Sequence, residues 1–158
     1  MRELAETLDR ERELFERLKN SVLKQKMAVI DRDMDSLNER LVEIERLSME
    51  IDALDEKRRE IFDDLKVSLG LSPNASLTDL INRLSGPDRE ILLNSLSKFL
   101  HAVNDLAAEV QGMKDMLEFE QTYFEFMKNL IAGGGGGTYS RSGQYKSAGA
   151  GGSFDTRW

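Results

Sequence analysis

The chain has no cysteine, a single histidine and only two prolines. Without cysteine, it has neither a disulfide framework nor a thiolate metal site. A di-iron helical bundle needs Glu-x-x-His motifs on two helices, so His101 alone excludes that class as well. Because Pro73 and Pro87 are the only prolines, and proline interrupts helices, long stretches can form uninterrupted helices.

Long apolar runs and basic clusters are also missing. No run approaches the roughly 18 residues that span a bilayer, and no signal peptide is visible at the start, so we expect a cytoplasmic protein without membrane insertion. The net charge is -7 and no basic face is apparent. Nucleic-acid binding requires such a face to displace counterions, so no nucleic-acid partner is expected.

Apolar residues instead recur every three or four positions, which predicts amphipathic helices. The first helix is predicted from about residue 2 to 30, with Glu11 and Gln25 interrupting its apolar seam. The second is predicted from about 34 to 69, after an N-cap at Asp33, and ends before Gly70. Arg58 fills a gap in its seam. The seam residues of the second helix are Leu37, Leu41, Ile44, Leu47, Ile51, Leu54, Ile61 and Leu65.

A short helix is predicted over residues 77–84, since Ser76 and Asp79 form an approximate capping box. The last and longest helix is predicted from Pro87 to about residue 132. Its seam keeps the 3–4 spacing throughout, with Glu120 as the exception. The seam residues are Leu92, Leu96, Phe99, Val103, Leu106, Val110, Met113, Leu117, Phe124, Met127 and Ile131.

These segments predict an all-α fold, an elongated antiparallel bundle of three long helices plus one short helix. The helical body covers residues 1–132. Residues 133–158 are rich in Gly and Ser and contain no Leu, Ile or Val. Such a composition buries too little apolar area to offset the entropy of ordering, so a flexible, disordered tail is expected.

No motif indicates catalysis or metal binding. Ser97, His101 and Asp105 lie one helical turn apart, but that spacing alone does not make a triad, and a lone histidine on a helix is usually a surface residue. The glycine run 133–137 lacks the Lys-Ser/Thr pair of a P-loop. We therefore expect no enzyme, no metal and no cofactor.

The last third of the long helix carries a second apolar stripe, next to the seam residue Met127. The stripe consists of Met116, Phe119, Tyr123, Phe126 and Leu130. Two interpretations remain open. The stripe could pack against both other long helices, or it could be exposed and bind an apolar partner helix. Methionines and aromatics suit the second role, because they adapt their shape and offer large contact areas.

In this order and at this length, several short stretches resemble the FlgN-like flagellar export chaperones. They are VIDRDMDSL at residues 29–37, LDEKRR at 54–59, the Gly70-Leu71 turn and TYSRSGQ at 138–144. Two departures are visible. Residues 111–117, QGMKDML, lack the asparagines that the family often has, and Ser140 replaces a glycine after the tail tyrosine.

The resemblance implies a cytoplasmic chaperone that binds the C-terminal helical regions of hook-associated proteins and delivers them to the type III export gate. It implies client binding in the C-terminal part, with the stripe and Met127, and docking at the gate through Tyr139. No cofactor is implied. The alternative is a structural coiled-coil protein, a homo-oligomer that self-associates through its seam and has no secretion client.

Overall fold

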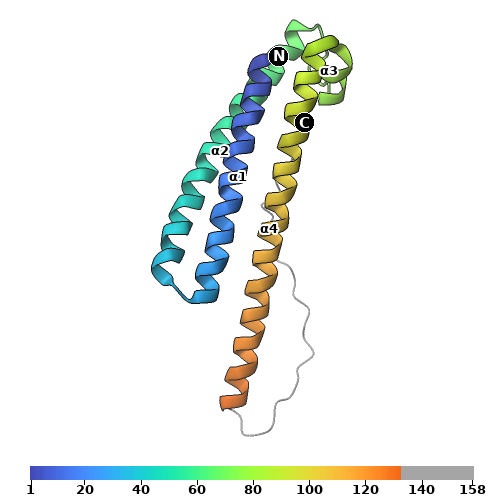
Figure 1. Cartoon of the computed structure of the whole chain (residues 1–158). Coiled ribbons are helices and arrows are strands. Elements are labelled where there is room, and N and C mark those ends of the chain that lie inside the picture. Colours follow the sequence, from blue (N-terminus) through green and yellow to red (C-terminus); the bar gives the residue numbers. More distant parts are fainter. Residues whose placement is uncertain (133–158) are drawn as a thin grey trace. The chain divides into compact units, whose positions relative to one another are not determined.

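The computed structural model describes residues 1–132, apart from the side chains of residues 123, 124, 131 and 132. It contains four helices: α1 (Arg2–Asp31), α2 (Met34–Ser68), α3 (Leu77–Arg83) and α4 (Gly86–Ala132) (Figure 1). The predicted all-α fold with three long helices and one short helix is confirmed. The first compact unit comprises residues 1–114, and the second begins at Asp115 within α4. The predicted tail, residues 133–158, lies outside the described residues.

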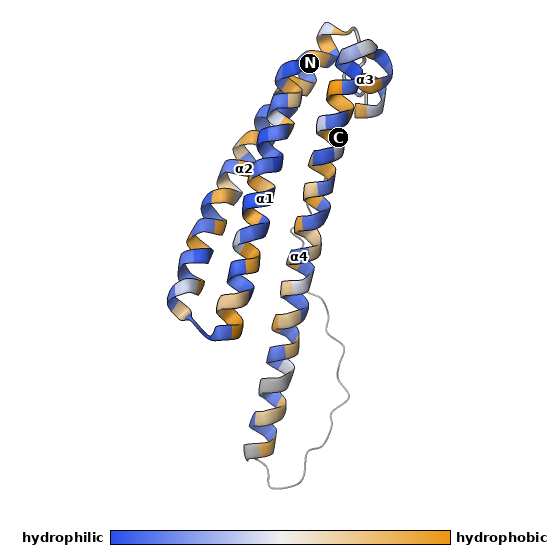
Figure 2. Ribbon diagram, viewed as in Figure 1, coloured by the Kyte–Doolittle hydropathy of each residue, from blue (hydrophilic) through white to orange (hydrophobic). Residues whose placement is uncertain are grey.

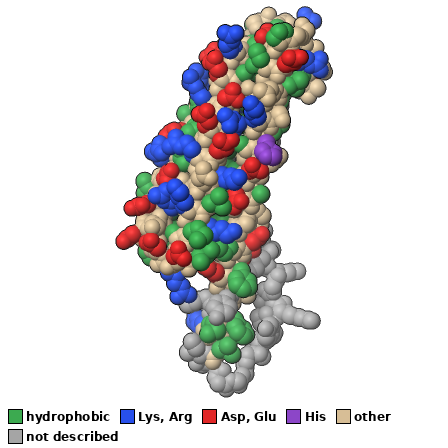
Figure 3. Space-filling view, in the orientation of Figure 1, with side chains coloured by type: hydrophobic (Ala, Val, Ile, Leu, Met, Phe, Trp, Pro, Cys, Tyr) green, Lys and Arg blue, Asp and Glu red, His purple; other side chains and the backbone are tan. Residues whose placement is uncertain are grey.

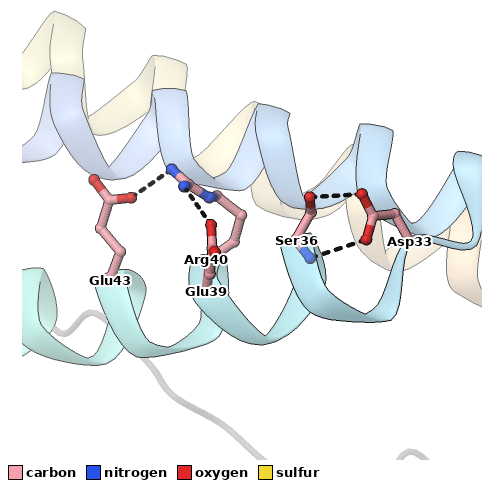
Figure 4. A network of polar contacts seen from close by, with 5 residues as sticks. All are labelled: Asp33, Ser36, Glu39, Arg40 and Glu43. Atoms are coloured by element: carbon pink, nitrogen blue, oxygen red, sulfur yellow. Dashed lines mark hydrogen bonds and ion pairs between the residues drawn. The ribbon is translucent and has the colours of Figure 1, made fainter.

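A two-residue turn joins α1 to α2. Arg32 adopts a left-handed conformation with φ 55°, and the backbone N–H groups of Arg32 and Asp33 donate to the carbonyls of Val29 and Ala28. Asp33 caps α2 as predicted. Its carboxylate accepts from the Ser36 backbone N–H at 3.1 Å and from the Ser36 hydroxyl at 2.7 Å (Figure 4). These bonds lower the pKa of Asp33. So short a turn makes α1 and α2 an antiparallel hairpin.

Ion pairs between nearby residues run along α2. The Arg40 guanidinium lies 2.7 Å from the Glu43 carboxylate and 3.5 Å from that of Glu39 (Figure 4). Basic and acidic side chains alternate in the same way over the visible face of the first compact unit (Figure 3). Ion pairs near the surface contribute little to stability, so the fold depends on the apolar residues that the helices bury.

The link from α2 to α4 folds through Gly70 and α3. Gly70 has φ 66°, the left-handed region that favours glycine after a helix. Ser76 and Asp79 form the predicted capping box, in which the Ser76 hydroxyl accepts from the Asp79 N–H and the Asp79 carboxylate accepts from the Ser76 N–H. Leu80 of α3 is fully buried. The short helix therefore adds to the core of the first unit as well as reversing the chain.

The core of the first unit lies where α4 packs against the hairpin. The Phe15 and Phe99 rings meet edge to face with centroids 5.7 Å apart, and Lys19 Nζ lies 3.8 Å from Asp105 Oδ2. Both contacts pair α1 with α4 in the same chain direction, so these two helices run parallel. Hydrophobic and hydrophilic bands follow one another along the helices in Figure 2, consistent with seam residues every three or four positions. The buried seam residues of α4 are Leu92, Leu96, Phe99, Leu106 and Met113.

The predicted seam of α2 is only partly right. Leu47 and Ile51 are buried, whereas Leu41 is exposed and Ile44 is half-buried. Phe62, which the pattern did not include, is buried instead. A period of 3.6 residues identifies the apolar face of a helix. It does not say along how much of its length another helix covers that face.

Candidate functional site

The second compact unit presents exposed apolar side chains on one side of α4, which we name the α4 face. Of its predicted residues, Phe119 is 71% exposed, Leu130 58%, Phe126 52% and Met127 36%. Met116 is half-buried, and the neighbouring seam residue Leu117 is 45% exposed. Single exposed apolar residues are ordinary on protein surfaces. Several large ones in succession on a single helix mark a surface that binds another apolar surface.

Two predicted site residues cannot be placed in full. Tyr123 lies within α4, but its side chain is outside the described set. Tyr139, predicted to dock at the export gate, lies outside the described residues altogether. The structure therefore places Met116, Phe119, Phe126, Met127 and Leu130, which recur at helical spacing on one apolar arc.

The segment of α4 that carries this face is acidic overall, and Glu120 is the carboxylate that lies among the apolar side chains of the face. Residues 115–130 contain four carboxylates, Asp115, Glu118, Glu120 and Glu125, against the single Lys128, which gives a net charge of -3. Glu120 occupies the seam position between Leu117 and Phe124, and its side chain is exposed. Within the described part of the chain, the Glu120 carboxylate makes neither a hydrogen bond nor an ion pair.

A second seam carboxylate, Glu11 of α1, has a very different environment. Glu11 is almost fully buried, and its Oε2 lies 2.9 Å from Nε of Arg58 on α2. The Arg58 guanidinium also contacts the Asp55 carboxylate and stacks 5.5 Å from the centre of the Phe99 ring on α4. One arginine thus connects all three long helices of the first unit.

Burial raises the pKa of Glu11 to about 7, although the charge of Arg58 acts in the opposite direction. Removing a carboxylate from water costs free energy that one ion pair only partly offsets. Sequence reasoning had found both residues, each as an interruption of an apolar seam, but had not paired them. Two interruptions of opposite charge on adjacent helices were the signal that could have done so.

The surface around His101 is open to solvent. His101 is largely exposed and its Nε2 lies 3.6 Å from Asp105 Oδ2, next to a shallow groove of 790 Å³ between α1 and α4. Across the described residues, His, Asp and Glu side chains nowhere form a group of three that could hold a metal ion. Over the same residues, no helix has the length and hydropathy needed to cross a lipid bilayer.

The fold defines a class: an all-helical protein whose last helix carries an exposed apolar face. The chain matches the family described as FlgN protein over residues 1–147. It therefore belongs to the FlgN family, whose members are flagellar export chaperones and not enzymes. No curated protein and no solved structure matches the chain.

Proposed function

We propose that this chaperone uses the α4 face to bind the C-terminal helical regions of hook-associated proteins, in the cytoplasm, and delivers them to the type III export gate. The observation that carries the proposal is the exposure of Phe119, Phe126 and Leu130 in succession on one helix. A client helix laid along this face would cover apolar area on both partners, at roughly 25 cal/mol per Å².

The α4 face continues a seam that already packs helix against helix. From Leu92 to Met113 most seam residues of α4 are buried, with Val110 exposed, and the same spacing continues through Leu117 and Met127, which are exposed. A client helix could therefore use the same side-chain interdigitation that holds the first unit together. Such a contact needs no bond-making chemistry and can be reversed at the gate.

The alternative, self-association through the same seam, is disfavoured by charge. Two copies of residues 115–130 would bring together two helical segments of net charge -3 each, with Glu120 in the contact face of both. Like charges placed opposite one another across an interface weaken it and reject the wrong partner. Light scattering on the purified chain is expected to show no oligomer that buries this face. A stable dimer lost on changing Phe119 and Phe126 to Ala would favour the structural alternative.

The test is an affinity measurement with hook-associated proteins from the same genome, intact and without their C-terminal helical segments. We expect Phe119→Ala with Phe126→Ala to lower the affinity at least tenfold, since each large side chain contributes about 1.5–3 kcal/mol when buried. The matched control is Met49→Ala with Val67→Ala, which removes two exposed apolar side chains from α2. It should leave the affinity unchanged.

Circular dichroism should give the same helix content for both double variants. If the Phe119 and Phe126 variant retains full affinity, the α4 face is not the client site. Equal binding by the truncated hook-associated proteins would contradict the role of their C-terminal helices.

Gate docking through Tyr139 is a separate part of the proposal, supported by the TYSRSGQ stretch and not by geometry. A Tyr139→Ala chain should bind clients normally but export them poorly, while Tyr145→Ala serves as the control in the same segment. Normal export with Tyr139→Ala would remove this residue from the mechanism and leave the client face intact.

A further inference from the structure

We infer that Glu120 selects the partner helix by pairing with an arginine that interrupts the partner's own apolar stripe. The inference rests on the proposed function, because it needs a helix bound along the α4 face. It concerns which partner helices the α4 face binds. The juxtaposition that carries it is the Glu120 carboxylate, which has no partner among the described side chains and lies at a seam position among exposed apolar residues.

The position of Glu120 on the helix is the first argument. Met116 and Leu117 lie one turn before it, and Met127 lies two turns after it on the same face. A helix that covers these three side chains therefore also covers the carboxylate. An ionised carboxylate removed from water without a partner costs several kcal/mol, enough to reject most helices.

The second argument comes from Glu11, where the same chain already buries a carboxylate at a seam position. That seam carboxylate is buried, and the side chain that meets it is Arg58, itself a seam interruption on the adjacent helix. The Arg58 guanidinium is held further by the Phe99 ring at 5.5 Å. Phe119 is next to Glu120 in the sequence and is largely exposed, so its ring is available to a partner arginine.

Charge complementarity favours arginine over a neutral donor. Residues 115–130 have a net charge of -3 summed around the helix, so a basic helix is attracted to this segment before any contact forms. Arginine remains charged when buried, and its planar group stacks on aromatics, whereas a lysine ammonium is more strongly hydrated. A single polar residue in an apolar seam also fixes the register of two helices. Glu120 would thus set both partner choice and alignment.

The experiment measures the affinity of the full chain for each hook-associated protein that it binds. Glu120→Gln removes the charge with little change in shape and should weaken binding at least tenfold, because it leaves the partner arginine buried and unpaired. The matched control is Glu118→Gln, two residues away and about 160° around the helix, which should change the affinity less than twofold. The loss should persist in about 0.5 M NaCl, since buried pairs are poorly screened.

A charge exchange identifies the partner residue. Glu120→Arg should abolish binding to the natural client, and replacing one arginine of the client's C-terminal helix by Glu should restore it. Normal affinity for Glu120→Gln, together with weak binding by Phe119→Ala with Phe126→Ala, would overturn this inference but not the client face. Normal affinity for both variants would overturn the inference and the proposed function together.

Discussion

One heptad pattern runs the length of α4, but its two parts have different environments. Between Leu92 and Met113 most seam residues are buried in the core of the first compact unit, whereas Leu117 and Met127 are exposed. Identical spacing therefore serves two purposes. It completes the chain's own bundle in one part and remains available to another protein in the other. The pattern predicts which residues face a helix, and it leaves open which protein provides that helix.

The two parts should respond very differently to truncation of a large side chain. Leu92→Ala is expected to lower the free energy of unfolding by about 3–4 kcal/mol, because Leu92 is fully buried and the change leaves a cavity. Phe126→Ala, although it removes more atoms, should change stability by less than about 0.5 kcal/mol. Urea denaturation followed by circular dichroism measures both. A large loss of stability with Phe126→Ala would show that the α4 face is part of the core.

The two seam carboxylates, Glu11 and Glu120, differ in the same way: Glu11 is buried in the first unit, and Glu120 is exposed in the second. Arg58→Met should destabilise the chain by about 3 kcal/mol at pH 8, since it leaves the buried Glu11 carboxylate without its cation. The loss should be much smaller at pH 5. Folding raises the pKa of Glu11 to about 7, so the folded chain binds more protons than the unfolded chain between pH 4.5 and 7. Stability from this group therefore falls as the pH rises through that window.

The control for Arg58→Met is the pair Glu11→Leu with Arg58→Met, which removes both charges. It should recover most of the lost stability and flatten the pH dependence, because apolar replacements of a buried ion pair are often neutral. Glu120→Leu should alter stability by less than about 0.5 kcal/mol at either pH. If the double variant is no more stable than Arg58→Met alone, Glu11 is not the group that Arg58 neutralises.

Gly112 offers the smallest effect, near the boundary between the two units. It lies inside α4, and an added Cβ would meet no atom within 4 Å. Gly112→Ala should therefore stabilise the chain by about 0.5–1 kcal/mol through helix propensity. The midpoint of urea denaturation measures the change, and client affinity should stay constant. Weaker client binding by this variant would mean that a poor helix former is needed at this point of α4.

Local chemistry made most of the fold predictable from the sequence. Asp33, Gly70 and the Ser76–Asp79 box end or begin helices through their own hydrogen bonds and backbone preferences, so the helix bounds agree within about two residues. These signals act over a few positions and need no knowledge of the rest of the chain.

Contacts between helices were harder to predict. Periodicity gives the face of a helix but neither its rotation nor its stagger against a neighbour. The Glu11–Arg58 pair, the exposure of Leu41 and the exposure of Phe119 all depend on that missing geometry. For the same reason, the sequence identifies the residues of the α4 face but does not decide whether they are exposed or packed in the core.

The two-residue turn at Arg32 and Asp33 has a consequence for biogenesis. Because α1 and α2 are adjacent in sequence, their pairing closes only short loops, and topologies of this kind form within microseconds to milliseconds. Translation adds only about 5–20 residues per second. The hairpin can therefore fold on the ribosome while α4 is still being synthesised. As α4 leaves the ribosome, it would then pack against a hairpin that is already folded.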